Sequence, residues 1–381
     1  MACYIASNNN RFYVARETGY GVPAPVTAAE RFPAVGLGIR EEREAVRRRD
    51  KTGTRTYQGV AAELRRRTEF EVKTYLASRD EGVAKPRYGA LLESALGESA
   101  VVSAGGMASV NGLVMQFQTQ HGLSEGMAVT AGAELRMVSG VVDAQTVVVS
   151  APFTPWMGTA PVGGGVSYGL SETLPSVTLY DYWSPETAVQ RMVRGAVVDE
   201  MEMEVNGDFH ELRFAGVAAE LRDSATEGAG YPAEPAVEVM DAAPVLGHLG
   251  QMWIGLGPSQ LHTVTSARVR VRNNIEARTR EFGSLGPRCI APGEREVTAE
   301  FELYSQDTAV FEEVYQAARW RQPVSLMLQM GDRAGQMAGV WMKSFVPETP
   351  EFLDEETRLR WRFRSSRAQG GVNDELWIAF G

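Results

Sequence analysis

Apolar and polar residues alternate along several segments of this chain. In "DEMEMEVNGD" (199–208), Met201 and Met203 fall on one side of an extended chain, and the glutamates between them fall on the other. The same alternation occurs in "TEFEV" (68–72) and in "AEFEL" (299–303). Because successive side chains of a β-strand point to opposite faces, this period of two predicts strands with one buried and one polar face.

Strand-like segments outnumber helical ones, which predicts a mainly β protein. Long alternating strands are expected at 57–76, 176–183 and 194–221. The dipeptide Asn206-Gly207 lies inside the last of these segments and is a strong signal for a hairpin turn.

Two segments have apolar residues at helical spacing. Residues 86–98 carry leucines on one helical face before a glycine, and residues 307–320 follow Asp307, which is placed as an N-cap. We therefore expect a short helix in each half of the chain, lying on a sheet.

Glycine and proline clusters and changes in strand spacing divide the chain into segments. The expected organisation is an N-terminal arm (1–33), a first main domain (34–105 with 167–223), a small β-barrel-like insertion (106–166), a linker rich in Gly, Ala and Pro (224–250), and a second main domain (251–381).

The pattern of the first main domain returns in the second. "IREEREAVRR" (39–48) aligns with "VRNNIEARTR" (271–280) at a constant offset, and "TEFEV" then aligns with "AEFEL" after a loop of similar length. A candidate helix follows in both copies. The matched pairs in the first alignment are Arg40 with Arg272, Glu44 with Glu276, Ala45 with Ala277 and Arg48 with Arg280. The same order of elements twice predicts a tandem duplication.

A charge-rich run, "GIREEREAVRRRDKTGTRTYQG" (38–59), raises a separate question. By itself it fits a solvated helix, a basic arm for nucleic acid, or a long loop that meets another subunit. Its counterpart at 271–294 contains Gly and Pro, which a continuous helix does not tolerate. The shared position favours a long loop between two strands.

Composition limits the functional classes. The 381 residues are 44% hydrophobic and 23% charged, as in an ordinary globular protein, and the net charge of −10 argues against a general nucleic-acid binder. The N-terminus lacks a signal-peptide pattern, and no apolar run reaches about 18 residues. We expect synthesis in the cytosol and no membrane span.

Catalytic and metal-binding motifs are not evident. Cys3 and Cys289 are far apart and are expected to be free thiols. The histidines are scattered without metal-ligand spacing, and no nucleophile elbow or phosphate-binding loop occurs. We therefore expect no catalytic residues, no metal, no cofactor and no enzymatic activity.

The layout resembles a known family of structural proteins. The order of elements, together with "ARETGYGVPAP" (15–25), "NGDFHELRFAGVAAEL" (206–221) and "GGVNDELWIAFG" (370–381), is similar to the tail tube proteins of long-tailed bacteriophages, specifically those with two fused tube domains. In that family each tube domain is a β-sandwich or barrel with one flanking helix. Six domains, here from three chains, make a ring, and rings stack into the hollow tube that conducts DNA.

This resemblance implies partners and a location. The partners would be further copies of the chain in trimeric rings, the tape measure, distal tail and terminator proteins, and double-stranded DNA in transient, non-specific passage. The location would be the virion tail, assembled in the cytoplasm of the host bacterium.

The resemblance also gives two sets of candidate residues. Acidic residues on strand faces could line the lumen, although a solvated sheet face is the ordinary meaning of such alternation; they are Glu69, Glu71, Glu200, Glu202, Glu204, Glu300 and Glu302. Charged residues of the two long loops are expected to contact neighbouring subunits; they are Arg43, Glu44, Arg47, Arg48, Arg49, Lys51, Arg55, Glu276, Arg278 and Arg280.

Two alternatives stay open. Distal tail and terminator proteins share the domain fold and form rings at the ends of the tail. An all-β carbohydrate-binding protein is the other, for which the tryptophans of the last domain, Trp320, Trp341, Trp361 and Trp377, are the support, although core and interface packing is the commoner role of such residues.

Overall fold

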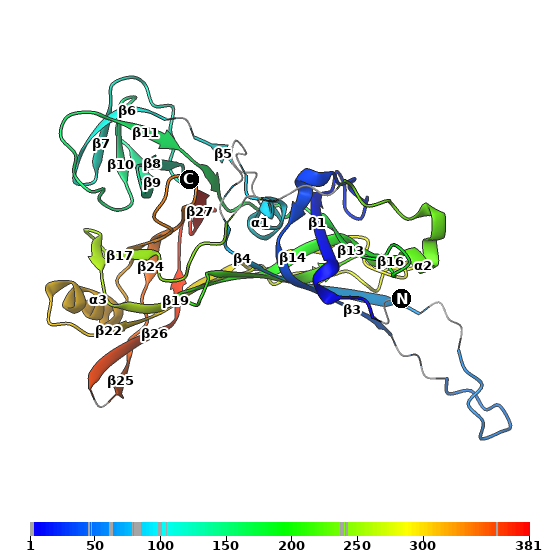
Figure 1. Cartoon of the computed structure of the whole chain (residues 1–381). Helices are drawn as coiled ribbons and strands as arrows, with labels where there is room; N and C mark the ends of the chain where they lie inside the picture. The colour runs from blue at the N-terminus through cyan, green and yellow to red at the C-terminus, as the bar shows by residue number, and fades with distance from the viewer. Residues whose placement is uncertain are drawn as a thin grey trace.

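A computed structural model gives the fold, and it is mainly β, as predicted from the sequence. The structure describes residues 4–44, 46, 48–60, 64–77, 79, 85–97, 101–103, 105–236, 240, 243–355 and 357–381. Its α-helices are short: α1 (Gly89–Leu96), α2 (Ser224–Glu227) and α3 (Ala309–Trp320). Short 3-10 helices occur at η1 (Ser7–Asn9), η2 (Ala28–Glu30) and η3 (Gly228–Gly230). The strands are antiparallel and are arranged as two units that lie side by side, with a small barrel above one of them (Figure 1).

The first unit is built from strands in two layers. In one layer β1 pairs with β2 and β13, and β13 pairs with β14, which also pairs with β16. In the other layer β14 pairs with β15, β15 with β4, and β4 with β3. The bounds are β1 Asn10–Arg16, β2 Arg31–Phe32, β3 Ala34–Arg43, β4 Arg66–Tyr75, β13 Val177–Trp183, β14 Arg191–Val205, β15 Glu211–Ala218 and β16 Glu220–Asp223.

The second unit repeats this order of pairing. Strand β17 pairs with β18 and β23, β23 pairs with β24, and β24 pairs with β27. In the other layer β25 pairs with β26, β26 with β22, and β22 with β19. The bounds are β17 Gly250–Gly255, β18 Ser259–Leu261, β19 Val264–Arg272, β22 Glu296–Tyr304, β23 Val324–Met330, β24 Ala338–Val346, β25 Glu351–Glu355, β26 Arg358–Ala368 and β27 Trp377–Phe380. The repeated topology is the one expected of tandem units.

The two units share one continuous sheet. Strand β14 of the first unit pairs with β19 of the second, so the strand order is β3-β4-β15-β14-β19-β22-β26-β25, which we call the shared sheet. Apolar side chains on one face of this sheet join a single core cluster that includes Val72, Met201, Val269 and Phe301. The sheet is therefore the structural link between the two units.

Strand β14 connects the layers because it bends at Gly195. Its first residues pair with β13 and β16, and the residues from Val197 onward pair with β15 and β19. Gly195 has a φ of 61°, and a Cβ there would lie 2.6 Å from the Cβ of Ala219. Both the left-handed backbone and the close approach require glycine at this position.

A small closed barrel interrupts the first unit between α1 and β13. Within the fully described stretch 105–236, its strands close in the order β10-β7-β6-β11-β8-β9 around an apolar core of their own. The bounds are β6 Gly106–Asn111, β7 Val114–Phe117, β8 Ala128–Ala131, β9 Glu134–Val141, β10 Thr146–Val149 and β11 Ala160–Gly164. This agrees with the fold class expected from the sequence, in which a small β module accompanies the two larger ones.

The barrel belongs to the first unit in sequence but packs on the second. Its stems, β5 (Val101–Val102) and β12 (Val166–Tyr168), extend the sheet of the second unit, where β12 pairs with β27. Leu135 and Met137 of the barrel join Trp253, Met327 and Trp341 of the second unit in one buried apolar cluster. The insertion therefore joins the two units at a second place, away from the shared sheet.

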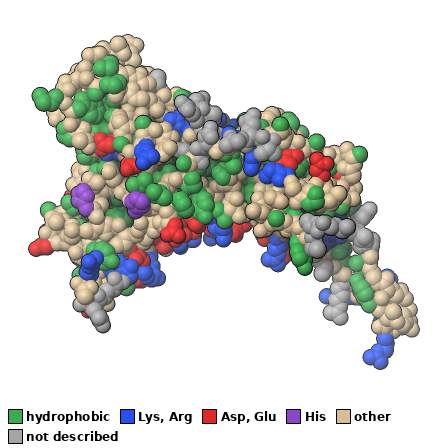
Figure 2. Space-filling model, in the orientation of Figure 1, with side chains coloured by type: hydrophobic (Ala, Val, Ile, Leu, Met, Phe, Trp, Pro, Cys, Tyr) green, Lys and Arg blue, Asp and Glu red, His purple; other side chains and the backbone are tan. Residues whose placement is uncertain are grey.

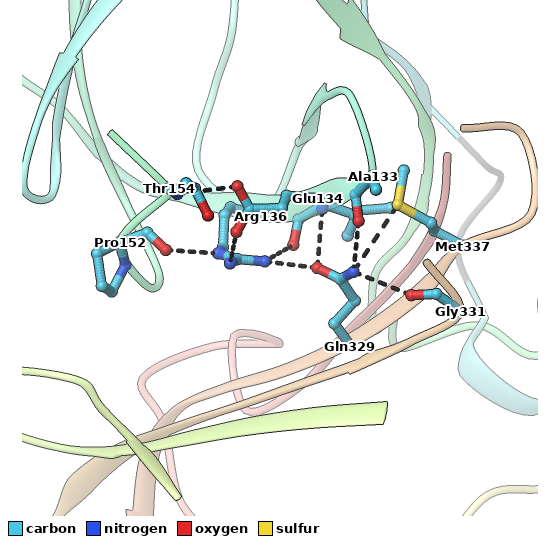
Figure 3. Close-up of polar contacts among 9 residues, drawn as sticks. Ala133, Glu134, Arg136, Pro152, Thr154, Gln329, Gly331 and Met337 are labelled. Atoms are coloured by element: carbon cyan, nitrogen blue, oxygen red, sulfur yellow. Dashed lines mark hydrogen bonds and ion pairs between the residues drawn. The ribbon is translucent and has the colours of Figure 1, made fainter. Parts of the chain in front are cut away.

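A buried arginine lies at the centre of this contact (Figure 3). Arg136 on β9 is fully buried, and its Nη1 donates to Gln329 Oε1 on β23 at 2.6 Å and to the Leu135 carbonyl at 2.8 Å. Its Nε donates to the Pro152 carbonyl at 3.1 Å, and its guanidinium lies 4.0 Å from the ring centroid of Trp253. Burial lowers the pKa of Arg136 to about 10, so the group stays charged at neutral pH.

Several local expectations differ from the structure. Residues 10–16 of the expected N-terminal arm form the buried strand β1, because Phe12 and Val14 face the core. Strand β4 begins at Arg66 rather than at residue 57. The N-cap of α3 is Thr308, not Asp307.

The repeat alignment also shifts. Arg40 lies inside β3, opposite Glu69, whereas Arg272 is the last residue of β19, opposite Glu296. The constant offset at 39–48 therefore does not match the strand positions, because the two hairpins differ in register. The hairpin at Asn206 is present, and Asn206 adopts a φ of 76°.

Replacing Arg136 by Met should loosen the barrel from the second unit. Gln329, Glu134 and Pro152 would each lose a hydrogen bond from the guanidinium inside a buried site, which should cost about 3 kcal/mol of stability. We expect a lower midpoint of thermal unfolding and faster proteolytic cleavage at the barrel stems. Arg319→Met, on the exposed side of α3, is the control; equal midpoints for the two variants would contradict this role of Arg136.

Candidate functional site

The face of the shared sheet that turns away from the core carries charged side chains of both signs. All the acidic residues expected to share a strand face lie on it: Glu69 and Glu71 on β4, Glu200, Glu202 and Glu204 on β14, and Glu300 and Glu302 on β22. Figure 2 shows acidic and basic side chains side by side along the hollowed lower edge of the molecule, below the shared sheet. We call this surface the ion-paired face.

Arginines from neighbouring strands pair with these glutamates. Arg213 on β15 lies between two acids, with Nη2 at 2.7 Å from Glu71 Oε2 and Nη1 at 2.8 Å from Glu200 Oε1. Arg270 on β19 reaches Glu202 Oε2 at 2.5 Å. In the second unit, Glu302 accepts from Arg360 at 2.9 Å and also pairs with Arg362.

The strand register places these charges opposite one another. Across the junction of β14 and β19, Glu200 faces Arg272, Glu202 faces Arg270, and Glu204 faces Arg268. Opposite charges at directly facing positions stabilise a sheet by roughly 0.2–1 kcal/mol each. The junction thus combines backbone pairing with a ladder of charge pairs.

The sequence predicts acidic side chains on this face, but the arginines were not predicted. Their signal is nevertheless present as alternation, in "ARVRVR" (267–272) and in "RLRWRFR" (358–364). Because each of these acids has a basic side chain that either faces it or reaches it diagonally from a neighbouring strand, the ion-paired face carries charges of both signs in close alternation. Its field at a distance is therefore much weaker than that of a face lined by carboxylates alone.

One ion pair occurs at equivalent places in both units. Arg213 faces Lys73 and reaches across to Glu71, and Arg360 faces Tyr304 and reaches across to Glu302. The shared diagonal geometry supports the duplication at the level of side chains. It also shows that the two halves of this face are built alike.

The hydrogen bond from Arg213 holds the pKa of Glu71 below the 4.5 of a free glutamate, and Lys73 acts in the same direction. The same contact raises the pKa of Arg213, and the hydrogen bond that Arg270 donates to Glu202 raises the pKa of Arg270. The Glu71 carboxylate is therefore charged at neutral pH and stays charged under mildly acidic conditions.

The first connecting loop is residues 44–65, and its described part, which includes residues 48–60, projects from the end of β3 away from the body (Figure 1). Arg43 is not part of it, because it is the last residue of β3. Glu44, Arg48, Arg49, Lys51 and Arg55 are exposed, and Arg47 lies outside the described residues. The hydrogen bonds and ion pairs of the described loop residues stay within the loop and its base, for example Arg48 Nε to Asp50 Oδ1 at 2.9 Å.

The second connecting loop, residues 273–295, is its counterpart. It contains a short pair of strands, β20 (Glu276–Ala277) and β21 (Ile290–Ala291). Glu276, Arg278 and Arg280 are exposed, and Arg278 pairs with Glu281 of the same loop at 3.3 Å. Unlike the first loop, it folds back onto the first unit, where its Leu285 carbonyl accepts from the Arg66 N–H at 2.7 Å.

The structure also places the residues considered for other chemistry. Among the described residues, no three His, Cys, Asp or Glu side chains gather as metal ligands. Trp341 is buried and stacks on Trp377 near the barrel, Trp361 packs beside Phe352, and Trp320 is exposed at the end of α3. These tryptophans do not form one platform. No described helix is both long and apolar enough to cross a membrane.

A comparison with known families matches nearly the whole chain. A family model described as "Phage tail tube protein" matches residues 7–371. No curated protein sequence matches the chain.

The Glu71–Arg213 pair should contribute a pH-dependent part of the stability. Because the folded pKa of Glu71 is lowered, its contribution is present above about pH 4.5 and is lost as the pH falls through the folded pKa. Both side chains are partly exposed, so a double-mutant cycle of Glu71→Gln and Arg213→Gln should give a coupling below about 1 kcal/mol that falls with added salt.

Urea unfolding at several pH values and salt concentrations measures this coupling. Glu186→Gln, in the exposed turn between β13 and β14, is the control and should change little. A coupling that is the same at pH 7 and at pH 3 would show that the pair has no electrostatic role in folding.

Proposed function

The chain belongs to the phage tail tube protein family, and on that basis we propose that three copies close into a ring whose stacked repeats form the tube for DNA ejection. The observation that carries this proposal is the β14–β19 junction, where two similar units already pair edge to edge within one chain. Repeating the same junction between chains would extend the sheet until it closes on itself.

The internal junction shows what such a contact contains. Six residue pairs run from Glu200 opposite Arg272 to Val205 opposite Ala267. On the core side Met201 and Met203 are fully buried against Val269 and its neighbours. Backbone pairing, charge pairs and apolar packing therefore coincide along a single seam.

Strands β3 and β25 are the edges that such a ring would join. Among the described pairings, β3 pairs only with β4 and β25 only with β26. Apolar side chains are exposed on both strands: Val35 on β3 is 59% exposed and Phe352 on β25 is 56% exposed. Open edges of this kind favour pairing with another chain, and ring closure removes them.

In this ring, we propose that the ion-paired face lines the lumen. The glutamates predicted for this role, such as Glu69, Glu202 and Glu300, share that face. Their arginine partners are already bound to carboxylates, so passing phosphates meet few free cations that could hold them. The barrel packs on the side away from this face and would decorate the outside.

The remaining partners follow from the tube itself. Rings would contact the tape measure protein inside, and the distal tail and terminator proteins at the two ends. The chain would be part of the virion tail after assembly in the cytoplasm of the host bacterium. This role is structural and requires no catalytic residue.

Electron microscopy of the purified chain tests the assembly directly. We expect rings of three chains and stacked tubes. Isolated rings that never stack would contradict the tube and favour a protein from one end of the tail, and a monomer at high concentration would contradict both.

Phe352→Asp should block ring formation. The ring of Phe352 stacks on Tyr315 with the ring centroids 6.0 Å apart and packs at a tilt against Trp361 at 5.4 Å, yet more than half of the residue faces solvent in the single chain. A charge there would be buried without a partner in the ring, so we expect a folded monomer by circular dichroism and no tubes. Met157→Asp, at a 98% exposed position of the barrel, should assemble normally. Tubes formed by the Phe352 variant would contradict the proposal that β25 lies at the interface between chains.

Reversing two charges on the proposed lumen tests its electrostatics. Glu204 and Glu300 both face Arg268, so Glu204→Lys with Glu300→Lys leaves three basic residues together. We expect tubes of normal appearance and slower, more salt-dependent DNA ejection from phage that carry the variant. The control is Glu186→Lys with Glu312→Lys, outside this face. Unchanged ejection would contradict the proposal that the ion-paired face lines the lumen.

A further inference from the structure

The second connecting loop packs against the first unit. Asn273 is buried, and its Nδ2 donates to the carbonyls of Ala95 at 2.8 Å and Val198 at 3.0 Å. The Ile275 N–H donates to Asp199 Oδ1 at 2.7 Å. The loop thus leaves β19 already attached to the neighbouring unit.

Its middle reaches the ends of β4 and β15 in the same unit. The Leu285 carbonyl accepts from Arg66, the first residue of β4. A Cβ on Gly286 would lie 2.8 Å from the carbonyl oxygen of Ala219, which directly follows β15. This close approach shows that the loop backbone fills the space at these strand ends.

The second unit has the same backbone arrangement at the corresponding place. The Ala219 N–H donates to the Arg194 carbonyl at 3.0 Å, and the Gln369 N–H donates to the Ser344 carbonyl at 2.8 Å. Gln369 follows β26 as Ala219 follows β15, and Glu296 begins β22 as Arg66 begins β4. Gln369 and Glu296 therefore mark the place in the second unit that corresponds to the contact site of the second connecting loop on the first unit.

In the second unit this position is an open groove. It encloses about 640 Å³, and its lining includes Val297, Arg367, Gln369 and Val372. Val372 is 80% exposed there. The place that a loop fills in the first unit is thus unfilled in the second.

The first connecting loop is the corresponding segment of the first unit, and no such contact site holds its described residues. It projects from the body, and its described contacts are internal (Figure 1). Leu285 lies eleven residues before Glu296, and Arg55 lies eleven residues before Arg66. Arg55 and Thr56 therefore lie within one residue of the positions that correspond to Leu285 and Gly286.

We propose that the first connecting loop of one chain fills the groove at Gln369 of the adjacent chain in the same ring. This rests on the proposed ring, in which β3 of one chain pairs with β25 of the next. The occupant is a second copy of this protein, and the contact repeats between chains the one that the second loop makes within the chain. Thr56 then lies against Gln369.

Both the loop and the groove carry exposed charged side chains. The loop carries the basic residues Arg48, Arg49, Lys51 and Arg55, and all four are exposed. Three acidic residues, Glu172, Glu294 and Glu375, line the groove together with Arg295, Arg321 and Arg367, and Glu294, which is 83% exposed, pairs with Arg367 at 2.9 Å. Exposed charges of opposite sign guide orientation and register more than they add affinity.

A disulfide between Thr56→Cys and Gln369→Cys tests the contact, with Cys3→Ser and Cys289→Ser to remove the native thiols. Assembled tubes are oxidised, dissolved in detergent and separated without reductant. We expect cross-linked species that stop at the trimer, because a ring of three chains closes on itself. Thr56→Cys with Met157→Cys, which pairs the loop with the barrel, should give no cross-link.

The other outcomes distinguish the proposed groove contact from the proposed tube function. Tubes without a cross-link would overturn the groove assignment and leave the tube function intact. A ladder that continues beyond the trimer would place the loop in a groove of the next ring and would also overturn the assignment. Failure of the unmodified chain to form rings would overturn the proposed function and this contact with it.

Discussion

The edge-to-edge pairing of β14 with β19 is the interaction on which the rest of the structure depends. A β-strand has hydrogen-bonding groups along both edges, and a sheet that ends in water leaves one row of them unpaired. Here the seam between the two units satisfies such a row inside one chain, and it places Met201 and Val269 in a common core. The two units consequently fold as neighbours in one sheet rather than as separate domains on a flexible linker.

The same seam determines the electrostatics of the sheet. Strand pairing fixes which side chains face one another, so the acidic residues of β14 meet the basic residues of β19 at every second position. The charges are held close to their partners, and their effect at longer range largely cancels. A surface of this kind is well hydrated but binds anions weakly, which suits a wall past which a charged polymer must move.

Much of this architecture could be predicted from the sequence, because alternation and duplication are local signals. The period of two placed Glu202 and Glu302 on polar strand faces, and the repeated order of strands and helix indicated two similar units. The limits of β3 were less accessible, since Arg40 and Glu42 continue the strand with charged residues on its outer face and the run reads as a loop.

Contacts between distant segments could not be predicted in this way. The position of the barrel depends on Arg136 meeting Gln329, which is 193 residues further along the chain, and no spacing rule connects them. The arginine partners of the lumen candidates are different, because Arg268 and Arg270 alternate with apolar residues. That pattern is visible in the sequence, but only the pairing of β19 with β14 shows that these arginines face glutamates.

The barrel adds a mechanical consequence. Its chain leaves the first unit and returns to it, yet its body is fixed on the second by a buried guanidinium and stacked tryptophans. The two units are therefore held at two separate points, one at the shared sheet and one above it, and two points of attachment resist bending where a single seam would act as a hinge. The curvature between neighbouring units is in this way built into the single chain, so a growing ring would receive arcs that are already shaped.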